Sequence, residues 1–508
     1  MHTLINRVLS FLSSRKALYL ILALFSFESL WIALSSRFPM AFDEQVHYGI
    51  TKLHTTTWLP FFGHLPAYAN EFGPVTRDPS FLFYYLQSFP LRLIALFTDS
   101  LTVQIIVLRI LNIGLVVAGL VVFRRLLLRL GLNSLRSNII IGFFCLIPVF
   151  PLMAGQVSYD NMAFLMTAVV LLLGVKFLQR FQKDGSIDAS TLTALLLSGL
   201  FASMVKYPFL PIFAAVVLCA GWVVVRNFHK TTKAYVAWWK PLALKFKVLV
   251  VTSLIVGTGL FAGSYGLNLV RYHNPVPKCD KVLSIDECRI YAPWNRDYVA
   301  SLTPHDEPGL RDTLNYFPHW VRQMMHETFF IVTSYYDNQG KAYYHGNEPL
   351  PILFVTGWVL FVIGSVAVVL NLRFLWANPA YRLLLITLVL YTLALLQMEL
   401  SLFQKTGNAV AIHGRYLIPL MIPTIGLAVL DTGRLLKRLP TGSFTASQLR
   451  AFKTGGLVVV FLLALQGGGL VSYIMVMDNR WVWQQSQPVK DLNNGARNLL
   501  EPLIYKSE

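Results

Sequence analysis

Long apolar runs alternate with short polar segments along most of the chain. Apolar runs of roughly 18 residues or more are typical of membrane-spanning helices. The runs cover about residues 17–35, 103–123, 138–154, 162–178, 190–205, 207–225, 248–269, 350–371, 383–403, 415–431 and 455–477. The pattern therefore predicts an all-helical protein with about eleven transmembrane helices.

The composition agrees with this pattern. Of 508 residues, 55% are hydrophobic and 13% are charged, whereas soluble domains carry about 25% charged residues. A chain with so little charge cannot cover a soluble surface. We therefore interpret residues 1–508 as one transmembrane domain that uses the lipid bilayer as its solvent.

The net charge of +18 does not indicate nucleic-acid binding, because the basic residues gather in short clusters between the apolar runs. Such clusters mark the cytoplasmic ends of spans, and an even number of runs separates each consecutive pair of them. This parity predicts a multi-pass protein of the plasma (inner) membrane. The first run could also be a signal peptide, but its length and the Glu28 inside it favour an uncleaved helix.

Parity places two long polar segments on the extracytoplasmic side. Segment 36–102 includes an apolar stretch, 81–97, which contains Pro90 and Arg92 and would break the parity if it crossed the membrane. We predict that this stretch is a juxtamembrane helix on the outer leaflet. Segment 270–349 contains an amphipathic run at 316–325 and is predicted to be a cap loop over the outer face.

Two of the four cysteines, Cys279 and Cys288, share the cap segment. In an oxidising compartment such a local pair favours a disulfide, and two free thiols are the alternative. The other two, Cys145 and Cys219, lie inside apolar runs and are most simply core residues.

The same parity brings several polar motifs to the extracytoplasmic face. They are Asp43 and Glu44 after the first run, Asp160 and Asn161, Lys206, and the group His413, Arg415 and Tyr416. Carboxylates at the edge of a span are expensive to keep near lipid. Acids and cations on one face therefore predict a functional site.

Each of these residues also has a structural interpretation. Asp160 is a suitable N-cap for the helix that follows it, and Lys206 and Arg415 could be interfacial anchors. His47 lies one helical turn after Asp43, a spacing that fits either a structural hydrogen bond or a metal ligand.

The chemistry of this set suits a lipid-borne phosphate. The outer face has no nucleotide pool, so an activated sugar would reach it on a polyprenyl phosphate. Departure of the sugar builds negative charge on the phosphate, which needs fixed cations such as Lys206 and Arg415. The acceptor hydroxyl needs a base, for which a carboxylate is the usual choice.

These motifs resemble the GT-C class of membrane glycosyltransferases, which includes protein O-mannosyltransferases and lipid A aminoarabinose transferases, and in particular its bacterial branch. The resemblance covers about residues 1–225 and 405–430. The matching segments are the acidic pair 43–44, the stretch 77–86, Arg109 with the basic pair 124–125, and the motifs 159–161, 206–208 and 414–419. Asp78-Pro79-Ser80 stands where the family has His-Pro-Pro, so the resemblance implies no histidine role there.

For the acidic side of the site, the resemblance implies that Asp43 is the general base. Glu44 would organise the loop or help hold a divalent cation. Asp160, with Asn161 and His47 beside it, would assist at the sugar or at a metal. Members of the class differ in metal dependence, so a magnesium or manganese ion is an open possibility.

On the donor side, the resemblance implies that Lys206 and Arg415, with Tyr416 beside them, bind the phosphate of the polyprenyl-phosphate sugar. The acceptor would be an envelope glycan, a lipid or a protein, and the reaction one inverting displacement. The rival interpretation is a transporter or flippase for an anionic or lipid-linked substrate. Glu28 and Glu399, which lie inside apolar runs, favour that rival.

Overall fold

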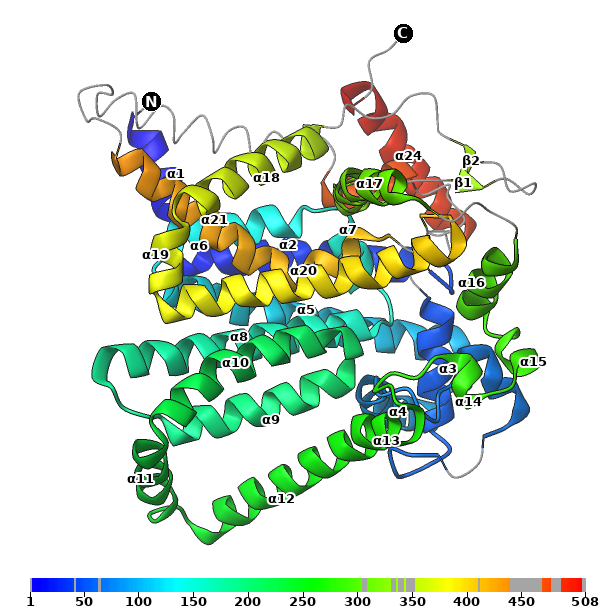
Figure 1. The fold of residues 1–508 in the computed structure, drawn as a ribbon. Coiled ribbons are helices and arrows are strands. Elements are labelled where there is room, and N and C mark those ends of the chain that lie inside the picture. Colours follow the sequence, from blue (N-terminus) through cyan, green and yellow to red (C-terminus); the bar gives the residue numbers. More distant parts are fainter. Residues whose placement is uncertain are drawn as a thin grey trace.

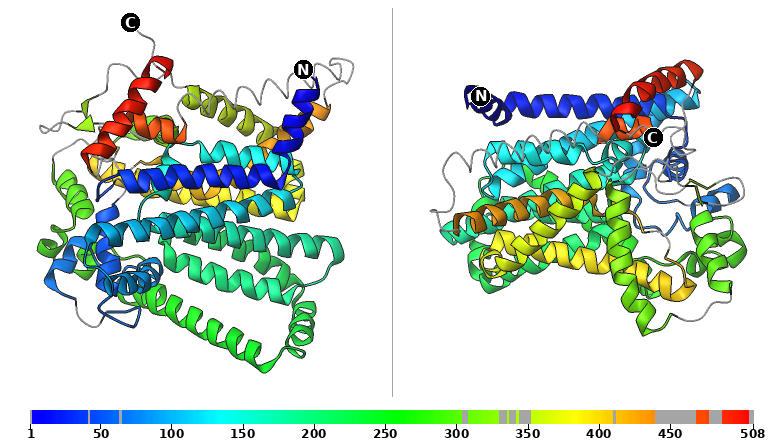
Figure 2. Two further views of the ribbon diagram at one scale, coloured as in Figure 1. Left: turned by 180° about the vertical axis from the view of Figure 1, so that it is seen from behind. Right: turned by 90° about the horizontal axis from the view of Figure 1, so that it is seen from above.

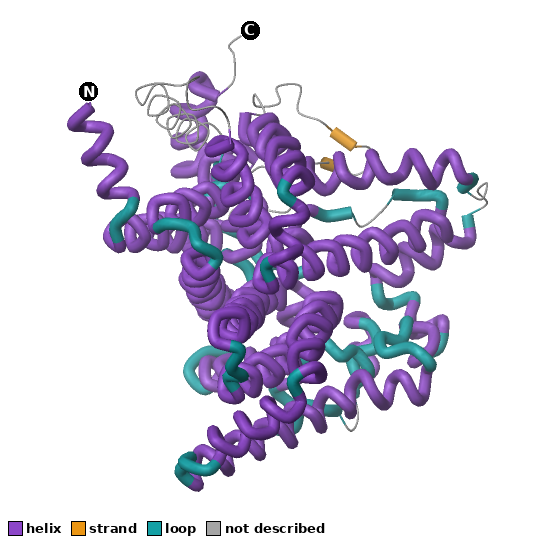
Figure 3. Tube along the Cα trace, turned by 60° about the vertical axis from the view of Figure 1, so that its left-hand side comes forward, coloured by secondary structure: helices purple, strands orange, loops and turns teal. Residues whose placement is uncertain are grey.

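The computed structural model is helical almost throughout (Figure 3). It describes residues 2–40, 43–62, 65–303, 308–329, 335–336, 342–343, 352–409, 412–438, 468–476 and 486–504. In these ranges the strands are limited to one antiparallel pair, β1 (Tyr335–Tyr336) with β2 (Ala342–Tyr343). The predicted all-helical class is therefore confirmed apart from this small ribbon.

The helices of the first half of the chain are α1 (His2–Leu12), α2 (Arg15–Ser35), α3 (Glu44–His54), η1 (Ala67–Phe72), α4 (Leu82–Ala95), α5 (Leu101–Arg129), α6 (Ser134–Cys145), α7 (Val149–Ala154), α8 (Tyr159–Asp184), α9 (Ala189–Val205), η2 (Tyr207–Phe209), α10 (Leu210–Arg226), α11 (Phe228–Trp239) and α12 (Leu244–Phe261). The second half has η3 (Ala262–Gly266), α13 (Leu267–Tyr272), α14 (Cys279–Val282), α15 (Ile285–Cys288), α16 (Ala292–Leu302), α17 (Leu310–Phe329), α18 (Ile352–Leu370), α19 (Leu372–Ala377), α20 (Pro379–Thr406), η4 (Gly414–Leu417), α21 (Ile418–Arg438), α23 (Gly469–Val476) and α24 (Gln487–Ile504).

Most of the predicted spans are helices. Seven helical segments of the described chain are long and apolar enough to cross a membrane: Arg15–Ser35, Leu101–Arg129, Tyr159–Asp184, Tyr207–Arg226, Leu244–Tyr272, Pro379–Thr406 and Gly414–Thr432. Shorter apolar helices occupy Ser134–Cys145, Ala189–Val205 and Gly357–Leu370. The chain is a multi-pass membrane protein; the total of eleven spans stays a prediction, because most of the last run, 455–467, lies outside the described residues.

One predicted span is a broken helix in the structure, and its crossing of the membrane stays a prediction. The run 138–154 is divided into α6, which ends at Cys145, and the short α7, which begins at Val149. Pro148 and Pro151 lack the backbone N–H that a continuous helix would need. Neither piece alone has the roughly 20 residues that a membrane crossing requires.

The core of the bundle is packed around α5 and α8, which lie side by side (Figure 1). Gly119 of α5 allows this approach, because a Cβ there would lie 2.6 Å from the Phe164 ring of α8. Phe164 in turn stacks on Phe144 at 5.8 Å between ring centroids. Close packing of this kind fixes where the ends of both helices lie.

The connections between the long helices gather at two opposite ends of the bundle (Figures 1 and 2). One end carries α11 and α19, and the other carries α3, α4 and α14 to α16. The first group belongs to the segments predicted to face the cytoplasm. The second group belongs to the two long segments predicted to lie outside, so the structure separates the two sets as the parity requires.

The first outer segment forms a helical layer at this second end. Its helix α4 includes Pro90 and corresponds to the stretch 81–97; it is not among the candidate spans. Arg92 ties it to the end of α3 by donating to the carbonyls of His54 and Thr57. Leu96 and Phe97, at the end of this helix, are about 80% exposed, which suits the predicted place on a lipid surface.

The described part of segment 270–349 is also largely helical. Cys279 and Cys288 form the expected disulfide. The amphipathic run 316–325 lies within α17, which buries Tyr316, Trp320 and Met324. The Trp320 indole donates to the Glu399 carboxylate of α20, so α17 is fixed to the bundle.

Candidate active site

The site begins at the turn between α2 and α3, where Asp43 has a left-handed backbone conformation with φ 66° and ψ 27°. Aspartate adopts this conformation more readily than most residues. The Asp43 side chain does not cap α3 and remains about half exposed, and its Oδ2 accepts a hydrogen bond from Arg415 at 3.1 Å. The carboxylate is therefore held at the surface of the site by a cation from the distant segment η4.

Glu44, the next residue, lies in the opposite kind of environment. Its carboxylate is fully buried and forms an ion pair with Arg109 of α5 at 2.7 Å. Its two oxygens also accept from the backbone amides of Met40 and Val157 at 2.8 and 3.0 Å. Four donors thus occupy both oxygens, so of the two roles predicted for Glu44 the geometry favours organising the loop.

Asp160 and Lys206 form a third ion pair at the same end of the bundle. Asp160 lies in the first turn of α8 and Lys206 directly follows α9, and both side chains are buried. The Lys206 ammonium lies 4.7 Å from the ring centre of Tyr159 and 5.1 Å from that of Tyr416. These aromatic faces add favourable cation–π contacts around the charge.

The segment around Arg415 is held by helix α17. Gly414 is necessary there, since a Cβ would lie 2.2 Å from Thr328 Oγ1 and 2.5 Å from Thr328 N. The His413 ring caps η4 by accepting from the Arg415 amide at 3.2 Å. The Tyr416 carbonyl accepts from the Tyr391 hydroxyl at 2.7 Å. Arg415 is therefore aimed at Asp43 by packing from the cap and by bonds within its own turn.

The turn before α8 explains two further residues. Ser158, and not Asp160, is the N-cap: its hydroxyl accepts from the Asp160 amide at 3.2 Å. The structural interpretation of Asp160 as a cap is therefore wrong, and its carboxylate is available for Lys206. Asn161, predicted to assist at the sugar or a metal, instead donates its amide to Asn112 Oδ1 and to the carbonyls of Met153 and Gln156, at 3.0 to 3.1 Å.

His47 of α3 contacts two tyrosines. Its Nδ1 is 2.9 Å from the Tyr84 hydroxyl, and its ring lies 4.6 Å from that of Tyr159, centroid to centroid. Burial lowers the pKa of His47 to about 4, although the charges of Asp43 and Asp160 act in the opposite direction. Of the two interpretations of His47, the geometry favours the structural hydrogen bond.

The described residues do not provide an evident metal site. No group of three His, Cys, Asp or Glu side chains able to hold a metal ion is found among them. Asp43 and Asp160 each face a cation, and Glu44 is occupied by four donors. The magnesium or manganese ion that the sequence left as an open possibility has no matching ligand set among the described residues, and no step below depends on one.

Arg109 and Asp78 were not singled out as site residues by the sequence patterns. The position of Arg109 inside a predicted span indicated that its charge requires a partner. Its pairing with Glu44, 65 positions away, could not be predicted from residue spacing. Asp78 lies in the first outer segment and has no comparable signal in the sequence.

No protein family model matches this sequence, and no curated protein matches it. Among solved structures, the fold has a likeness to the oligosaccharyltransferase of Archaeoglobus fulgidus in its apo form, with a TM-score of 0.42, 12% identity and 94% of this chain covered. The same enzyme tethered to an acceptor peptide that contains the NVT sequon gives a TM-score of 0.43 with 13% identity over 90% of this chain. This chain spans 59% and 55% of the length of those two chains.

Proposed function

We propose that this protein is a GT-C glycosyltransferase that moves a sugar from a polyprenyl-phosphate donor to an acceptor hydroxyl. The observation that carries the proposal is the contact between the half-exposed Asp43 and Arg415, with the Lys206–Asp160 pair beside it. A base and two cations at one end of a membrane bundle are the parts that this reaction needs.

Arg415 and Lys206 bind the donor phosphate in this scheme. A guanidinium is well suited to two phosphate oxygens because its donors form a planar fork. When Arg415 turns to the phosphate, Asp43 loses its hydrogen-bonding partner and is available to the acceptor. Lys206 stays in place between Tyr159 and Tyr416 and supplies the second positive charge.

The transfer is a single displacement. Asp43 takes the proton of the acceptor hydroxyl while the acceptor oxygen bonds to the anomeric carbon from the face opposite the phosphate. The bond between that carbon and the phosphate oxygen breaks, and its electron pair leaves with the polyprenyl phosphate. The cations stabilise the added negative charge, and the configuration at the anomeric carbon is inverted.

The two ends of the bundle support an extracytoplasmic site in the plasma membrane. The end opposite the site carries α11 with its adjoining loops, where Arg226, Lys230, Lys233 and Lys240 gather. Such basic residues favour the cytoplasm. The disulfide at the site end favours an oxidising compartment, in which a lipid-borne donor is the natural source of activated sugar.

The transporter alternative has less support. Its main argument was the presence of Glu28 and Glu399 inside spans, as expected for a substrate path near the midplane. Glu399, however, is hydrogen-bonded to Trp320 of α17, and this bond fixes the cap to the bundle. The polar residues of the proposed site, Asp43, Asp160, Lys206 and Arg415, lie at one end of the bundle and not along a path through it.

The test is turnover by the purified protein in nanodiscs. Radiolabelled undecaprenyl-phosphate sugars are supplied with octyl glucoside and octyl galactoside as hydroxyl acceptors, and release of the lipid phosphate is measured. We expect Asp43→Asn to lower the rate by about 100- to 10,000-fold, the usual contribution of a general base. Asp99→Asn, at an exposed aspartate of the same outer segment, is the matched control.

Full activity of Asp43→Asn would refute the assignment of the base. If the wild-type protein neither releases lipid phosphate nor binds bare undecaprenyl phosphate, the glycosyltransferase proposal fails as a whole.

A further inference from the structure

A third aspartate, Asp78, lies at the site and has no part in the scheme above. Its Oδ1 accepts from the Ser80 amide at 2.8 Å, which forms a tight turn just before α4. The Ser80 hydroxyl in turn accepts from the backbone amide of Tyr207 at 3.0 Å. Because Tyr207 directly follows Lys206, this turn is fixed next to one of the two cations.

Asp78 differs from the other two aspartates in its partners. Asp43 and Asp160 each form an ion pair, whereas no cation of the described residues lies within ion-pair distance of Asp78. Among the described residues, the Asp78 side chain accepts hydrogen bonds from Ser80 alone. As a residue Asp78 is neither fully buried nor exposed, and its carboxylate has unused acceptor capacity.

Tyr291 reaches the same place from the second outer segment. Its ring packs on Gly73, where a Cβ would lie 2.9 Å from Tyr291 Cδ1 and where φ is +80°. Burial raises the pKa of the Tyr291 phenol, and the negative charges of Asp78 and then Asp43 raise it further. A tight turn, in which the Asp78 amide donates to the Pro74 carbonyl at 3.0 Å, joins Gly73 to Asp78, so the Tyr291 ring packs on the segment that carries Asp78.

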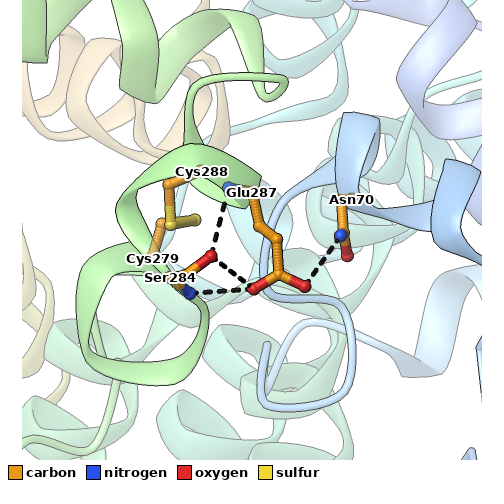
Figure 4. Close-up of a disulfide and its surroundings, with 5 residues drawn as sticks. All are labelled: Asn70, Cys279, Ser284, Glu287 and Cys288. Atoms are coloured by element: carbon orange, nitrogen blue, oxygen red, sulfur yellow. Dashed lines mark hydrogen bonds between the residues drawn. A yellow bond between two sulfur atoms is a disulfide. The ribbon is translucent and has the colours of Figure 1, made fainter.

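The disulfide lies three residues before this tyrosine in the chain, and Figure 4 shows it beside Glu287 and Asn70. Cys288 is bonded to Cys279, and the Cys288 carbonyl accepts from the Tyr291 amide at 3.0 Å. Glu287, in the same short helix α15, accepts from Asn70 of the first outer segment at 3.3 Å. The two outer segments are thus joined beside the site, and the join sets the place of Tyr291.

We propose that Asp78 and Tyr291 form a subsite that binds the hydroxyl groups of a sugar next to Asp43. A carboxylate oxygen without a cation accepts hydrogen bonds from neighbouring hydroxyls, and such charged hydrogen bonds are among the stronger ones. A tyrosine offers an apolar ring face together with a polar hydroxyl, as sites for amphipathic ligands commonly do. This inference rests on the proposed function, and the sugar is that of the donor or that of the acceptor.

A purely structural role for Asp78 makes a different prediction. The turn uses one side-chain oxygen as an acceptor from Ser80, and an asparagine provides the same oxygen. Asp78→Asn should therefore keep the turn and remove only the charge. Loss of ligand binding in this variant, with unchanged thermal stability, separates the two roles.

The experiment is native mass spectrometry of the full chain in detergent, titrated with three kinds of probe. The first is bare undecaprenyl phosphate, the second is the same lipid carrying mannose, glucose, galactose or N-acetylglucosamine, and the third is the octyl glycosides of these sugars. We expect Asp78→Asn to weaken the best sugar-bearing ligand by about tenfold or more, the value of a lost charged hydrogen bond. Binding of the bare lipid phosphate should change by less than about twofold.

The arms of the titration distinguish the two sources of the sugar. A loss confined to the sugar-loaded lipids places the donor sugar at Asp78, and a loss confined to the octyl glycosides places the acceptor there. Tyr291→Phe should weaken the same ligands less than Tyr291→Ala, because it keeps the ring. Asp99→Asn and Tyr68→Phe, at exposed residues of the first outer segment, are the matched controls.

Two results overturn the inference without touching the proposed function. One is unchanged binding of every sugar-bearing probe by Asp78→Asn and Tyr291→Ala. The other is a wild-type protein that binds none of the sugar-bearing lipids more tightly than the bare lipid and also binds no octyl glycoside. Failure of the proposed function has a separate signature, namely no binding of bare undecaprenyl phosphate or no effect of Arg415→Gln on it.

Discussion

Asp43 and Glu44 are neighbours in the chain, yet each belongs to a different region of the molecule. Glu44 is sealed against Arg109, and both side chains have no exposed surface. Asp43 meets Arg415 at the rim, where 54% of its side chain is exposed. The two residues face apart because Asp43 has a left-handed backbone and α3 begins at Glu44. One short sequence therefore supplies both a fully buried ion pair and a partly exposed one.

The sealed pair keeps the open pair in place. Through its four bonds, Glu44 joins the loop after α2, helix α5 and the turn before α8. Arg109 also donates to the carbonyls of Ala33 and Ser36 at 2.7 and 2.9 Å. With these segments locked, Asp43 is presented to Arg415 without needing to be buried itself, and it keeps the exposure that the proposed base would need.

The first prediction concerns the sealed pair and has the largest expected effect. Glu44→Gln should destabilise the folded protein by about 3–5 kcal/mol, because it leaves the Arg109 charge buried without its counter-charge. The measurement is an SDS titration of the purified protein in mixed micelles, followed by tryptophan fluorescence. Glu71→Gln, at an exposed glutamate of η1, serves as the control.

The same titration can show that the effect belongs to the pair. Arg109→Met should cost a similar amount, and the double variant Glu44→Met, Arg109→Met should cost less than the sum of the two single changes. Strict additivity, or a wild-type midpoint for Glu44→Gln, would show that the bond is not important for stability.

The second prediction uses His47, a buried residue of helix α3, which begins at Glu44. Its folded-state pKa of about 4 is below the value of about 6.5 for an unfolded chain, so the unfolded state binds the proton first as the pH falls. The stability associated with neutral His47 is fully present above about pH 6.5 and decreases as the pH falls toward 4. Between pH 7 and 5 the loss amounts to about 2 kcal/mol.

His47→Gln should remove this part of the acid sensitivity. The check is the difference between the SDS midpoints at pH 7 and pH 5 for the variant and the wild type. His229→Gln, at an exposed histidine of α11, should behave like the wild type. An equal loss of stability in wild type and His47→Gln would mean that His47 is protonated in the fold.

Sequence reasoning succeeded where one physical signal was enough. The long apolar runs became helices, and the basic clusters placed the ends of those helices, so the segments of Asp43, Asp160, Lys206 and Arg415 meet in the structure. No distance between them was needed for that prediction. The division of α6 from α7 shows the limit, because hydropathy counts apolar residues and does not register that two prolines interrupt the hydrogen bonding.

Contacts between the two long outer segments could not be predicted from the sequence. Asp78 and Tyr291 are separated by more than 200 positions, and their proximity depends on the join between Asn70 and Glu287 and on the packing of Tyr291 against Gly73. Likewise, nothing in the spacing of Asp43 and Glu44 tells which carboxylate is sealed. That choice is made by Arg109, whose reach from α5 is a property of the packed bundle.

The third prediction tests the open pair and has the smallest expected effect on stability. Asp43→Asn should change the unfolding free energy by less than about 1 kcal/mol, since ion pairs exposed to solvent contribute little and the side chain does not cap α3. The same SDS titration measures it, beside Glu44→Gln as the contrasting variant one position away. If Asp43→Asn proves as destabilising as Glu44→Gln, Asp43 is part of the frame, and its loss of activity could not then be assigned to proton transfer. A small change in stability combined with a large loss of transfer would assign Asp43 to the chemistry and Glu44 to the frame that holds it.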